Sequence, residues 1–243
     1  MPTIGLLYPG SSAEDDFPRL ERRLGTDLRL PVVHTSVGED AHRVDALLDL
    51  GSTERLAEGA RTLVAEHRPD SIMWACTSGS FVFGWQGAHD QVRALQARTG
   101  VPTSSTSLAF VEACRALSID RVSVAASYPR DVAERFVAFL DHGDIAVTAL
   151  GSHGIVTAAE VGTLGYEQVE AIATGADASG GAEAVLIPDT AMHSLQWIDK
   201  LEAAVGLPVL TANQVTVWQG IKLLGDVPRY DMLGTLFRTP DGG

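Results

Sequence analysis

The stretch "SIMWACTSGSF", residues 71–81, joins an apolar run to a cluster of hydroxyl-bearing residues around a glycine. The run from Ser71 to Cys76 is short and uncharged, which is typical of a strand buried on both faces of a parallel sheet. In open parallel sheets, ligands bind beyond the carboxyl ends of the strands. The stretch therefore predicts a parallel sheet and places a cysteine at its ligand-binding end.

Similar apolar runs alternate with amphipathic stretches along the whole chain. We expect strands at 3–9, 30–37, 71–76, 101–105, 121–127, 145–152, 184–189 and 208–213. Helical periodicity is clear at 53–67, 88–100, 129–143 and 191–206. Strand–helix alternation predicts an α/β fold, with parallel sheets joined by right-handed crossovers.

The chain also repeats itself weakly. "TIGLLYPG" (3–10) is similar to "SVAASYPR" (123–130), and "GVPTSSTS" (100–107) is similar to "GLPVLTAN" (206–213). We interpret this as two pseudo-symmetric α/β lobes, each a parallel sheet flanked by helices, with the active site in the cleft between them. The first lobe is expected to comprise 1–114 and 214–243, because a helix at 214–225 should return to it. The second lobe then comprises 115–213.

The repeat gives Cys76 a counterpart. "SIMWACTS" (71–78) aligns with "AVLIPDTA" (184–191), so Asp189 takes the matching place in the second lobe. A thiol where a strand turns into a helix is expected to have a lowered pKa, because of the helix dipole and free N–H groups. The alternatives are that Cys76 is a small buried hydrophobe and that Asp189 only caps the helix expected after it. His193 could tune Asp189 or face solvent, whereas Cys114 is expected to be structural, on the apolar side of a helix.

Composition excludes several classes of function. The chain has 18 Lys and Arg against 31 Asp and Glu and shows no basic stripe, so nucleic acid is not an expected partner. No apolar stretch reaches the ~18 residues of a membrane span, and the start lacks the basic n-region of a signal peptide. Two cysteines make no disulfide framework, so we expect a cytoplasmic protein with reduced thiols.

Cofactor motifs are absent from the sequence as well. The histidines and cysteines show no metal-ligand spacing. There is no GxGxxG, GxxxxGK[ST] or GxSxG pattern, which argues against nucleotide-binding and hydrolase readings of the α/β pattern. From the residues alone we therefore expect no metal site.

Several segments together resemble a known family. These are "TIGLLYP", "ACTSGSF", "GVPTSSTSLAFVEACRALSIDRVSVAASYPRDV", "ALGSHGI" and "DKLEAAVGLPVLTANQVTVWQGIKLLG". Over nearly its whole length, the chain is similar to the aspartate/glutamate racemase superfamily, in the branch that holds maleate cis–trans isomerase and arylmalonate decarboxylase. The resemblance implies two lobes around one active site, no cofactor, and a homo-oligomer, either a dimer or a tetramer.

The resemblance also implies roles for particular residues. Cys76 falls on the first-lobe catalytic cysteine of the isomerases and racemases, where the decarboxylase has a glycine. The substrate site is expected to include Thr77, Ser78 and Tyr128 as carboxylate ligands, with Pro9, Tyr8, Thr190 and Ala191 beside them. Asp189 stands where the family has its second cysteine, and this is the main departure.

The resulting expectation is a cofactor-independent enzyme acting on a small carboxylate, most similar to maleate isomerase. Cys76 would be the nucleophile or base, and Asp189 the opposing acid or base. The alternatives are an arylmalonate-type decarboxylase or lyase, a racemase, and a carboxylate-binding protein without catalysis. Racemisation is disfavoured because it needs two matched acid–base groups.

Overall fold

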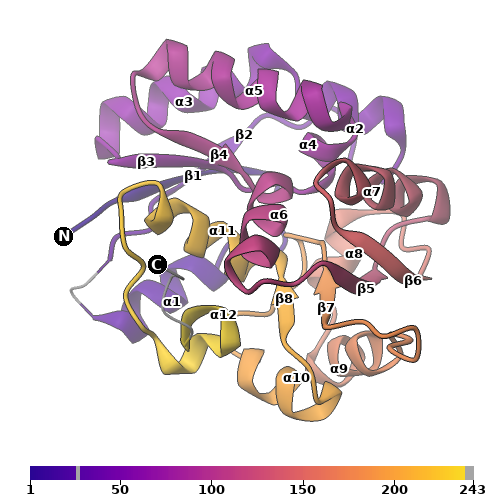
Figure 1. Ribbon diagram of the computed structural model, residues 1–243. Coiled ribbons are helices and arrows are strands. Elements are labelled where there is room, and N and C mark those ends of the chain that lie inside the picture. The colour runs from indigo at the N-terminus through magenta and orange to yellow at the C-terminus, as the bar shows by residue number, and fades with distance from the viewer. Residues whose placement is uncertain (26–27, 239–243) are drawn as a thin grey trace.

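The computed structural model describes residues 1–25 and 28–238, which form two four-stranded parallel sheets (Figure 1). The first sheet has the order β2 (Val32–Thr35), β1 (Ile4–Pro9), β3 (Ser71–Trp74), β4 (Thr103–Ser105). The second has the order β6 (Ala146–Ser152), β5 (Arg121–Ala126), β7 (Ala184–Ile187), β8 (Val209–Thr211). Because matching strands take the same order in both sheets, the predicted fold class is confirmed. The exact lobe boundaries stay a prediction, and residues 239–243 lie outside the described part of the chain.

Helices connect and cover these strands. In the first sheet, α3 (Thr53–His67) and α5 (Gly84–Thr99) pack side by side on one face (Figure 1). The others in this half are α1 (Asp16–Leu24), α2 (Val44–Leu50), α4 (Ser78–Phe81) and α6 (Thr106–Ala116). The later part of the chain contributes α7 (Arg130–His142), α8 (Ala158–Gly162), α9 (Tyr166–Thr174), α10 (Ile198–Val205), α11 (Ala212–Lys222), η1 (Asp231–Leu233) and α12 (Gly234–Arg238).

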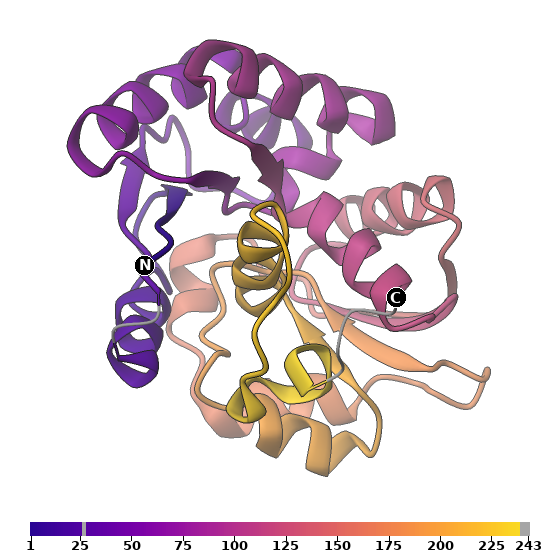
Figure 2. The same cartoon turned by 60° about the vertical axis from the view of Figure 1, so that its left-hand side comes forward.

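Two equivalent helices, α6 and α11, meet in the middle of the molecule (Figure 2). Each begins directly after the fourth strand of its own sheet. The buried hydroxyls of Thr106 and Thr216 are hydrogen-bonded across this contact, 2.6 Å apart. Helix α11 also packs against β3 and β4 of the first sheet. It contacts β8 of the second sheet as well, and its assignment to the first lobe stays a prediction.

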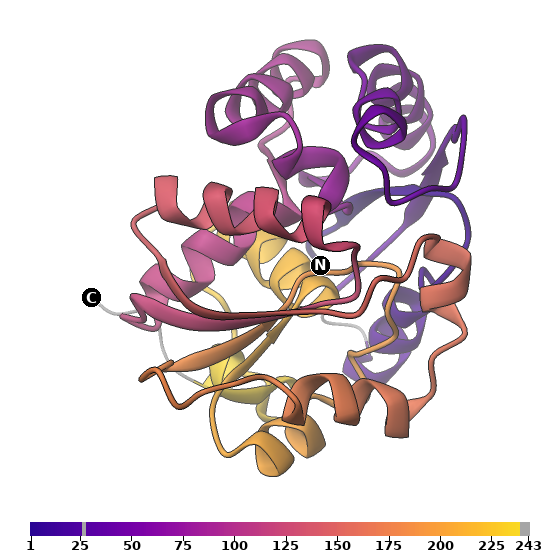
Figure 3. The same cartoon turned by 90° about the vertical axis from the view of Figure 1, so that its right-hand side faces the viewer.

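Helix α1 makes a second connection between the lobes. Figures 2 and 3 show it set apart from the helices that cover the first sheet, beside elements of the second lobe. Asp16 on this helix is only 2% exposed, and its Oδ2 accepts hydrogen bonds from the backbone N–H groups of Ser194 (2.8 Å) and Leu195 (3.1 Å). The chain that follows β7 is therefore held by a carboxylate from the other lobe.

One predicted helix is shorter than expected. The pattern at 191–206 predicts a helix directly after Asp189, but α10 begins only at Ile198. The reason is tertiary: the backbone N–H groups of Ser194 and Leu195 bond to Asp16 rather than to preceding carbonyls. Asp189 is consequently not a helix N-cap, and that alternative is wrong. Within the described ranges, no helix is both long and apolar enough to cross a membrane.

Candidate active site

Cys76 and Asp189 line the same cavity, whose volume is about 260 Å³. Cys76 lies two residues beyond the end of β3, and Asp189 lies two residues beyond the end of the matching strand β7. Of the other predicted site residues, the cavity is also lined by Tyr8, Pro9, Ser78, Thr190 and Ala191. Thr77, Tyr128 and His193 are not among its lining residues.

The Cys76 thiol is held in a closely packed turn. It is 3% exposed, and the backbone N–H of Gly79 donates to its sulfur at 3.3 Å. Burial raises the pKa of this thiol to about 12, and the negative charge of Asp189 acts in the same direction. The expectation of a lowered pKa is therefore wrong for the free protein. Loss of water around the sulfur outweighs the help of the Gly79 and Ser78 donors, and α4 is only a four-residue helix.

Asp189 is a buried carboxyl, 4% exposed, with a partner for each oxygen. Its Oδ1 accepts a hydrogen bond from the backbone N–H of Ala191 (2.9 Å), and its Oδ2 accepts one from the hydroxyl of Ser127. Burial raises the pKa of Asp189, although a positive charge on His42 and these hydrogen bonds oppose the rise. A carboxyl whose pKa is raised is better suited to give and take a proton near neutral pH.

Tyr8 lines the cavity, whereas Tyr128 lies behind its wall. The Tyr128 hydroxyl donates to the carbonyl oxygen of Pro188, and burial, with the charge of Asp189, raises the pKa of this phenol. The Tyr8 hydroxyl donates to the carbonyl oxygen of Thr190 at 2.9 Å. In the described structure Tyr128 therefore positions the chain at Asp189 and does not line the space in which a substrate would sit.

His193 lies elsewhere. Its Nε2 is 2.6 Å from Oδ1 of Asp15, at the start of α1, and the residue belongs to a different surface hollow. Since no helix follows Asp189 directly, His193 does not share a helical face with it. The suggested tuning of Asp189 by His193 has no support from this placement.

Residues after two further strands, together with residues of α2 and α8, complete the cavity. They are Gly10, Ser11 and Ser12 after β1; Val37, Glu39, Asp40, Ala41 and His42 after β2; Leu47 and Leu50 on α2; and Ala158 on α8. Our sequence interpretation missed all of them. The rule that ligands bind beyond the carboxyl ends of parallel strands would have indicated the first two groups, because β1 and β2 end immediately before them.

The loop after β2, residues 36–43, reaches across to the second lobe. The carboxylate of Asp40 accepts hydrogen bonds from the backbone N–H groups of Ala158 (2.8 Å) and Ala159 (3.0 Å) at the start of α8. His42 donates its backbone N–H to the carbonyl oxygen of Val156 at 2.7 Å. This loop thus forms one wall of the cavity and joins the two lobes.

No lysine or arginine is among the residues that line the cavity. Within residues 1–25 and 28–238, no group of three or more His, Cys, Asp or Glu side chains is placed to hold a metal ion. The lining residues carry instead a thiol, three carboxyls, one imidazole, and the hydroxyls of Tyr8, Ser11, Ser12, Ser78 and Thr190. Such a set suits nucleophilic and acid–base chemistry on a small molecule.

Comparison with known proteins agrees with this architecture. Arylmalonate decarboxylase of Bordetella bronchiseptica is 26% identical over 236 residues, covering 92% of this chain and 91% of its own. Maleate isomerase of Nocardia farcinica (strain IFM 10152) is 28% identical over 235 residues, covering 93% and 90%. A solved cysteine-to-serine variant of Nocardia farcinica maleate cis–trans isomerase, with a covalently bound succinylcysteine intermediate, is 25% identical, covers 98% of each chain and has a TM-score of 0.86. The family model described as arylmalonate decarboxylase matches residues 44–237. Since this match spans most of the sequence, the chain belongs to the arylmalonate decarboxylase family.

Proposed function

We propose that the protein is a cofactor-independent cis–trans isomerase of a small unsaturated dicarboxylate, similar to maleate isomerase. The observation that carries the proposal is that Cys76 and Asp189 line one cavity from matching strand ends of the two sheets. The succinylcysteine intermediate of the Nocardia farcinica isomerase supports a covalent role for a cysteine in this family.

The proposed reaction begins with addition of the Cys76 S–H across the double bond. The carboxylate of Asp189 takes the thiol proton, the sulfur bonds to one alkene carbon, and the π electron pair moves to the other carbon, which receives that proton from Asp189. The carbon–carbon bond is now single and rotates. On reversal Asp189 takes the proton from that carbon, the C–H electron pair re-forms the double bond as the carbon–sulfur bond breaks, and Asp189 returns the proton to the sulfur. The trans alkene leaves with no net change in atoms or electrons.

The substrate carboxylates need donors in a cavity without lysine or arginine. The hydroxyls of Ser12, Ser78 and Thr190 line it, and the chain beyond β3 and β7 presents backbone N–H groups. Hydroxyl and N–H donors of this kind stabilise anions and developing oxyanions in sites shielded from water. Thr77 and Tyr128 would act from behind this layer, by positioning it.

The test is proton NMR of the purified protein with maleate, followed over time for the appearance of fumarate. We expect turnover by the wild type and by Cys114→Ser, because Cys114 is fully buried within α6, outside the cavity. Cys76→Ser should abolish turnover. Turnover that survives Cys76→Ser would overturn the proposal.

Decarboxylation of a malonate is the second candidate. The family-model match over residues 44–237 favours it. The raised pKa of Asp189 favours it as well, because a protonated Asp189 can give its proton to the carbanion that forms after loss of carbon dioxide. Cys76 counts against it, because the resemblance places a glycine there in the decarboxylase. Release of carbon dioxide from malonates, without isomerisation of maleate, would select this candidate. If neither maleate nor a malonate is converted, a carboxylate-binding protein is the better description.

A further inference from the structure

The ionisable groups around the cavity are mostly acidic. Three carboxyl-bearing residues line it: Glu39, Asp40 and Asp189. Tyr8 and Cys76 carry no charge below alkaline pH, since burial raises the pKa of both. Among the described lining residues, His42 is the one side chain that can become positive. A carboxylate that enters this cavity is repelled by the charge of Asp189 unless that histidine offsets it.

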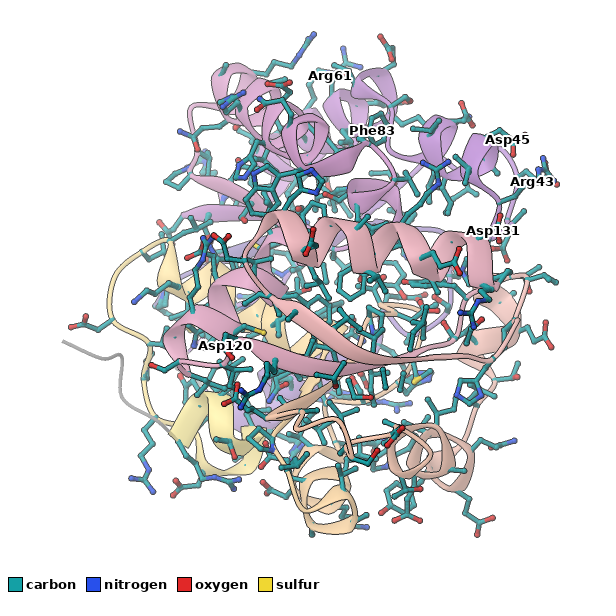
Figure 4. The ribbon with its side chains drawn as sticks, turned by 45° about the vertical axis from the view of Figure 1, so that its right-hand side comes forward. Arg43, Asp45, Arg61, Phe83, Asp120 and Asp131 are labelled. Atoms are coloured by element: carbon teal, nitrogen blue, oxygen red, sulfur yellow. The ribbon has the colours of Figure 1, made fainter. Side chains whose placement is uncertain are left out.

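The neighbouring Arg43 does not provide this charge. Its guanidinium binds Asp45 (Nε to Oδ1, 2.6 Å) and Glu39 (Nη2 to Oε2, 2.9 Å), and the side chain is 55% exposed. Figure 4 shows Arg43 and Asp45 at the outer edge of the molecule, directed away from its centre. The loop after β2 thus places the permanent cation of Arg43 outside the cavity and the imidazole of His42 on its wall.

The imidazole of His42 is held in a fixed position. The residue is 7% exposed, and its ring meets that of Tyr128 edge-on, with centroids 4.9 Å apart. Its Nδ1 lies 2.8 Å from the carbonyl oxygen of Ile155. Because a carbonyl only accepts, Nδ1 carries a hydrogen, and protonation of the ring therefore adds a donor at Nε2.

His42 is also close enough to Asp189 for a charge on the ring to lower the pKa of that carboxyl. No hydrogen bond joins the two side chains within the described structure, although both line the same cavity. An anion that binds in the cavity therefore does not have to break a hydrogen bond between these two side chains. Tyr128 contacts the ring, and the other ionisable groups that line the cavity are Glu39 and Asp40 on its own loop, Tyr8 and Cys76.

We propose that His42 is the residue that selects carboxylates for this cavity, by offsetting the charge of Asp189 and giving an Nε2–H donor to the incoming anion. The proposal rests on the proposed function only for the statement that the substrate is a carboxylate. It assigns to this loop a residue for anion recognition in a site that lacks lysine and arginine.

The test compares two alkylating reagents of nearly the same size, iodoacetate and iodoacetamide, at Cys76. Rates are measured at pH 7 by mass spectrometry of the peptide that contains Cys76. The iodoacetate-to-iodoacetamide ratio cancels changes in thiol reactivity and reports how the cavity treats a negative charge. A unit positive charge a few ångströms away favours the anion by roughly tenfold, so we expect the ratio to fall by about this factor in His42→Gln.

Two controls separate charge from loop structure. His193→Gln removes a histidine outside the cavity and should leave the ratio unchanged. Asp40→Asn weakens the hold of the same loop on α8 but removes a negative charge, so it should raise the ratio. The proposal is overturned if His42→Gln keeps the wild-type ratio, or if Asp40→Asn lowers it equally. It also fails if neither reagent modifies Cys76 even at pH 9, since the cavity would then be closed to such anions.

This experiment is independent of turnover. A protein that leaves maleate unchanged but loses its preference for iodoacetate in His42→Gln would contradict the isomerase and keep the role of His42. If the wild type converts maleate, His42→Gln is expected to raise KM by roughly tenfold, with a smaller effect on kcat. An unchanged KM in that variant would remove the role of His42 and leave the isomerase intact.

Discussion

Tyr8 and Tyr128 hold the chain on either side of Asp189. The Tyr8 hydroxyl donates to the carbonyl oxygen of Thr190 at 2.9 Å, and the Tyr128 hydroxyl donates to that of Pro188. The two tyrosines come from matching strands, at the end of β1 and just beyond the end of β5, and both are 1% exposed. The position of the Asp189 carboxyl is therefore set from both lobes together.

We expect Tyr128→Phe to weaken both folding and turnover. The Pro188 carbonyl would be left without its buried donor, which should lower the free energy of unfolding by about 1–3 kcal/mol. Asp189 would lose part of its restraint, and turnover should fall by roughly tenfold or more. Urea denaturation and the maleate assay measure the two effects. Tyr166→Phe, which removes a hydroxyl bonded to Glu170 on the surface helix α9, is the matched control and should change neither appreciably.

A methyl group at Gly79 should disturb the Cys76 thiol directly. A Cβ on Gly79 would lie 3.0 Å from the sulfur of Cys76 and 3.1 Å from the ring of Trp74. Both are tighter than ordinary contacts, so Gly79→Ala should displace the thiol and reduce turnover far more than it reduces Tm. Gly151→Ala is the control, because the nearest atom to its new Cβ is 3.6 Å away. Wild-type turnover in Gly79→Ala would show that the thiol needs no fixed position.

The raised pKa of Cys76 predicts slow alkylation at neutral pH. Its rate with iodoacetamide should rise about tenfold for each pH unit through pH 8–11, because only the thiolate reacts. Asp189→Asn should shift this profile to lower pH, because the Asp189 charge contributes to the rise in the pKa of Cys76. A plateau near pH 7 in the wild type would contradict the burial of the thiol.

The same shift has a consequence for stability. Burial raises the pKa of Cys76 from the model-compound value of 9.0 to about 12, so the folded state prefers the protonated thiol. This preference contributes fully to the free energy of unfolding below pH 9, and the contribution is lost as the pH rises toward 12. Between pH 8 and pH 10.5, the free energy of unfolding measured by chemical denaturation should therefore fall less for Cys76→Ala than for the wild type. An equal loss in both proteins would assign the alkaline sensitivity to other groups.

Asp16→Ala should be strongly destabilising. Oδ2 of Asp16 accepts hydrogen bonds from the N–H groups of Ser194 and Leu195 and from Nδ2 of Asn213. Removing it leaves three buried donors without their acceptor, which should cost roughly 3 kcal/mol or more in the free energy of unfolding. Asp15→Ala provides the control, because its pairs with Arg19 and His193 lie at a 44%-exposed carboxylate and such pairs contribute about 1 kcal/mol or less. Similar losses in the two variants would contradict the role of Asp16.

The strands and their parallel arrangement in two sheets were predictable because they depend on local pattern and on the internal repeat; the order of the strands within each sheet was not predicted. All eight expected strands occur, within a few residues of the expected limits. The helix at 191–206 was only partly predictable, since Asp16 lies about 180 residues away in sequence and captures the backbone donors of Ser194 and Leu195. Periodicity measures the preference of a segment for a helix, and it carries no information about a distant competitor for its N–H groups.

The site was predictable where it followed the strand ends. Cys76, Asp189, Ser78 and Pro9 all line the cavity, as expected from the repeat and the resemblance. The sequence did not indicate His42. The contacts that matter for it are the hydrogen bond with Ile155 and the electrostatic interaction with Asp189, and both residues lie far away in sequence. The predicted direction of the shift in the pKa of Cys76 was wrong, because the depth of burial of the thiol depends on the packing of the whole fold. The catalytic roles, the oligomeric state and the cytoplasmic location stay predictions.

The two sheets share their strand order, but positions 76 and 189 carry unlike groups. A pocket with the same group at both places could treat mirror-image molecules alike. A thiol at one place and a carboxyl at the other make the pocket itself chiral, beyond the handedness of the backbone. Whenever a proton from Asp189 creates a stereocentre, we therefore expect a single enantiomer, and exchanging the two side chains should favour its mirror image.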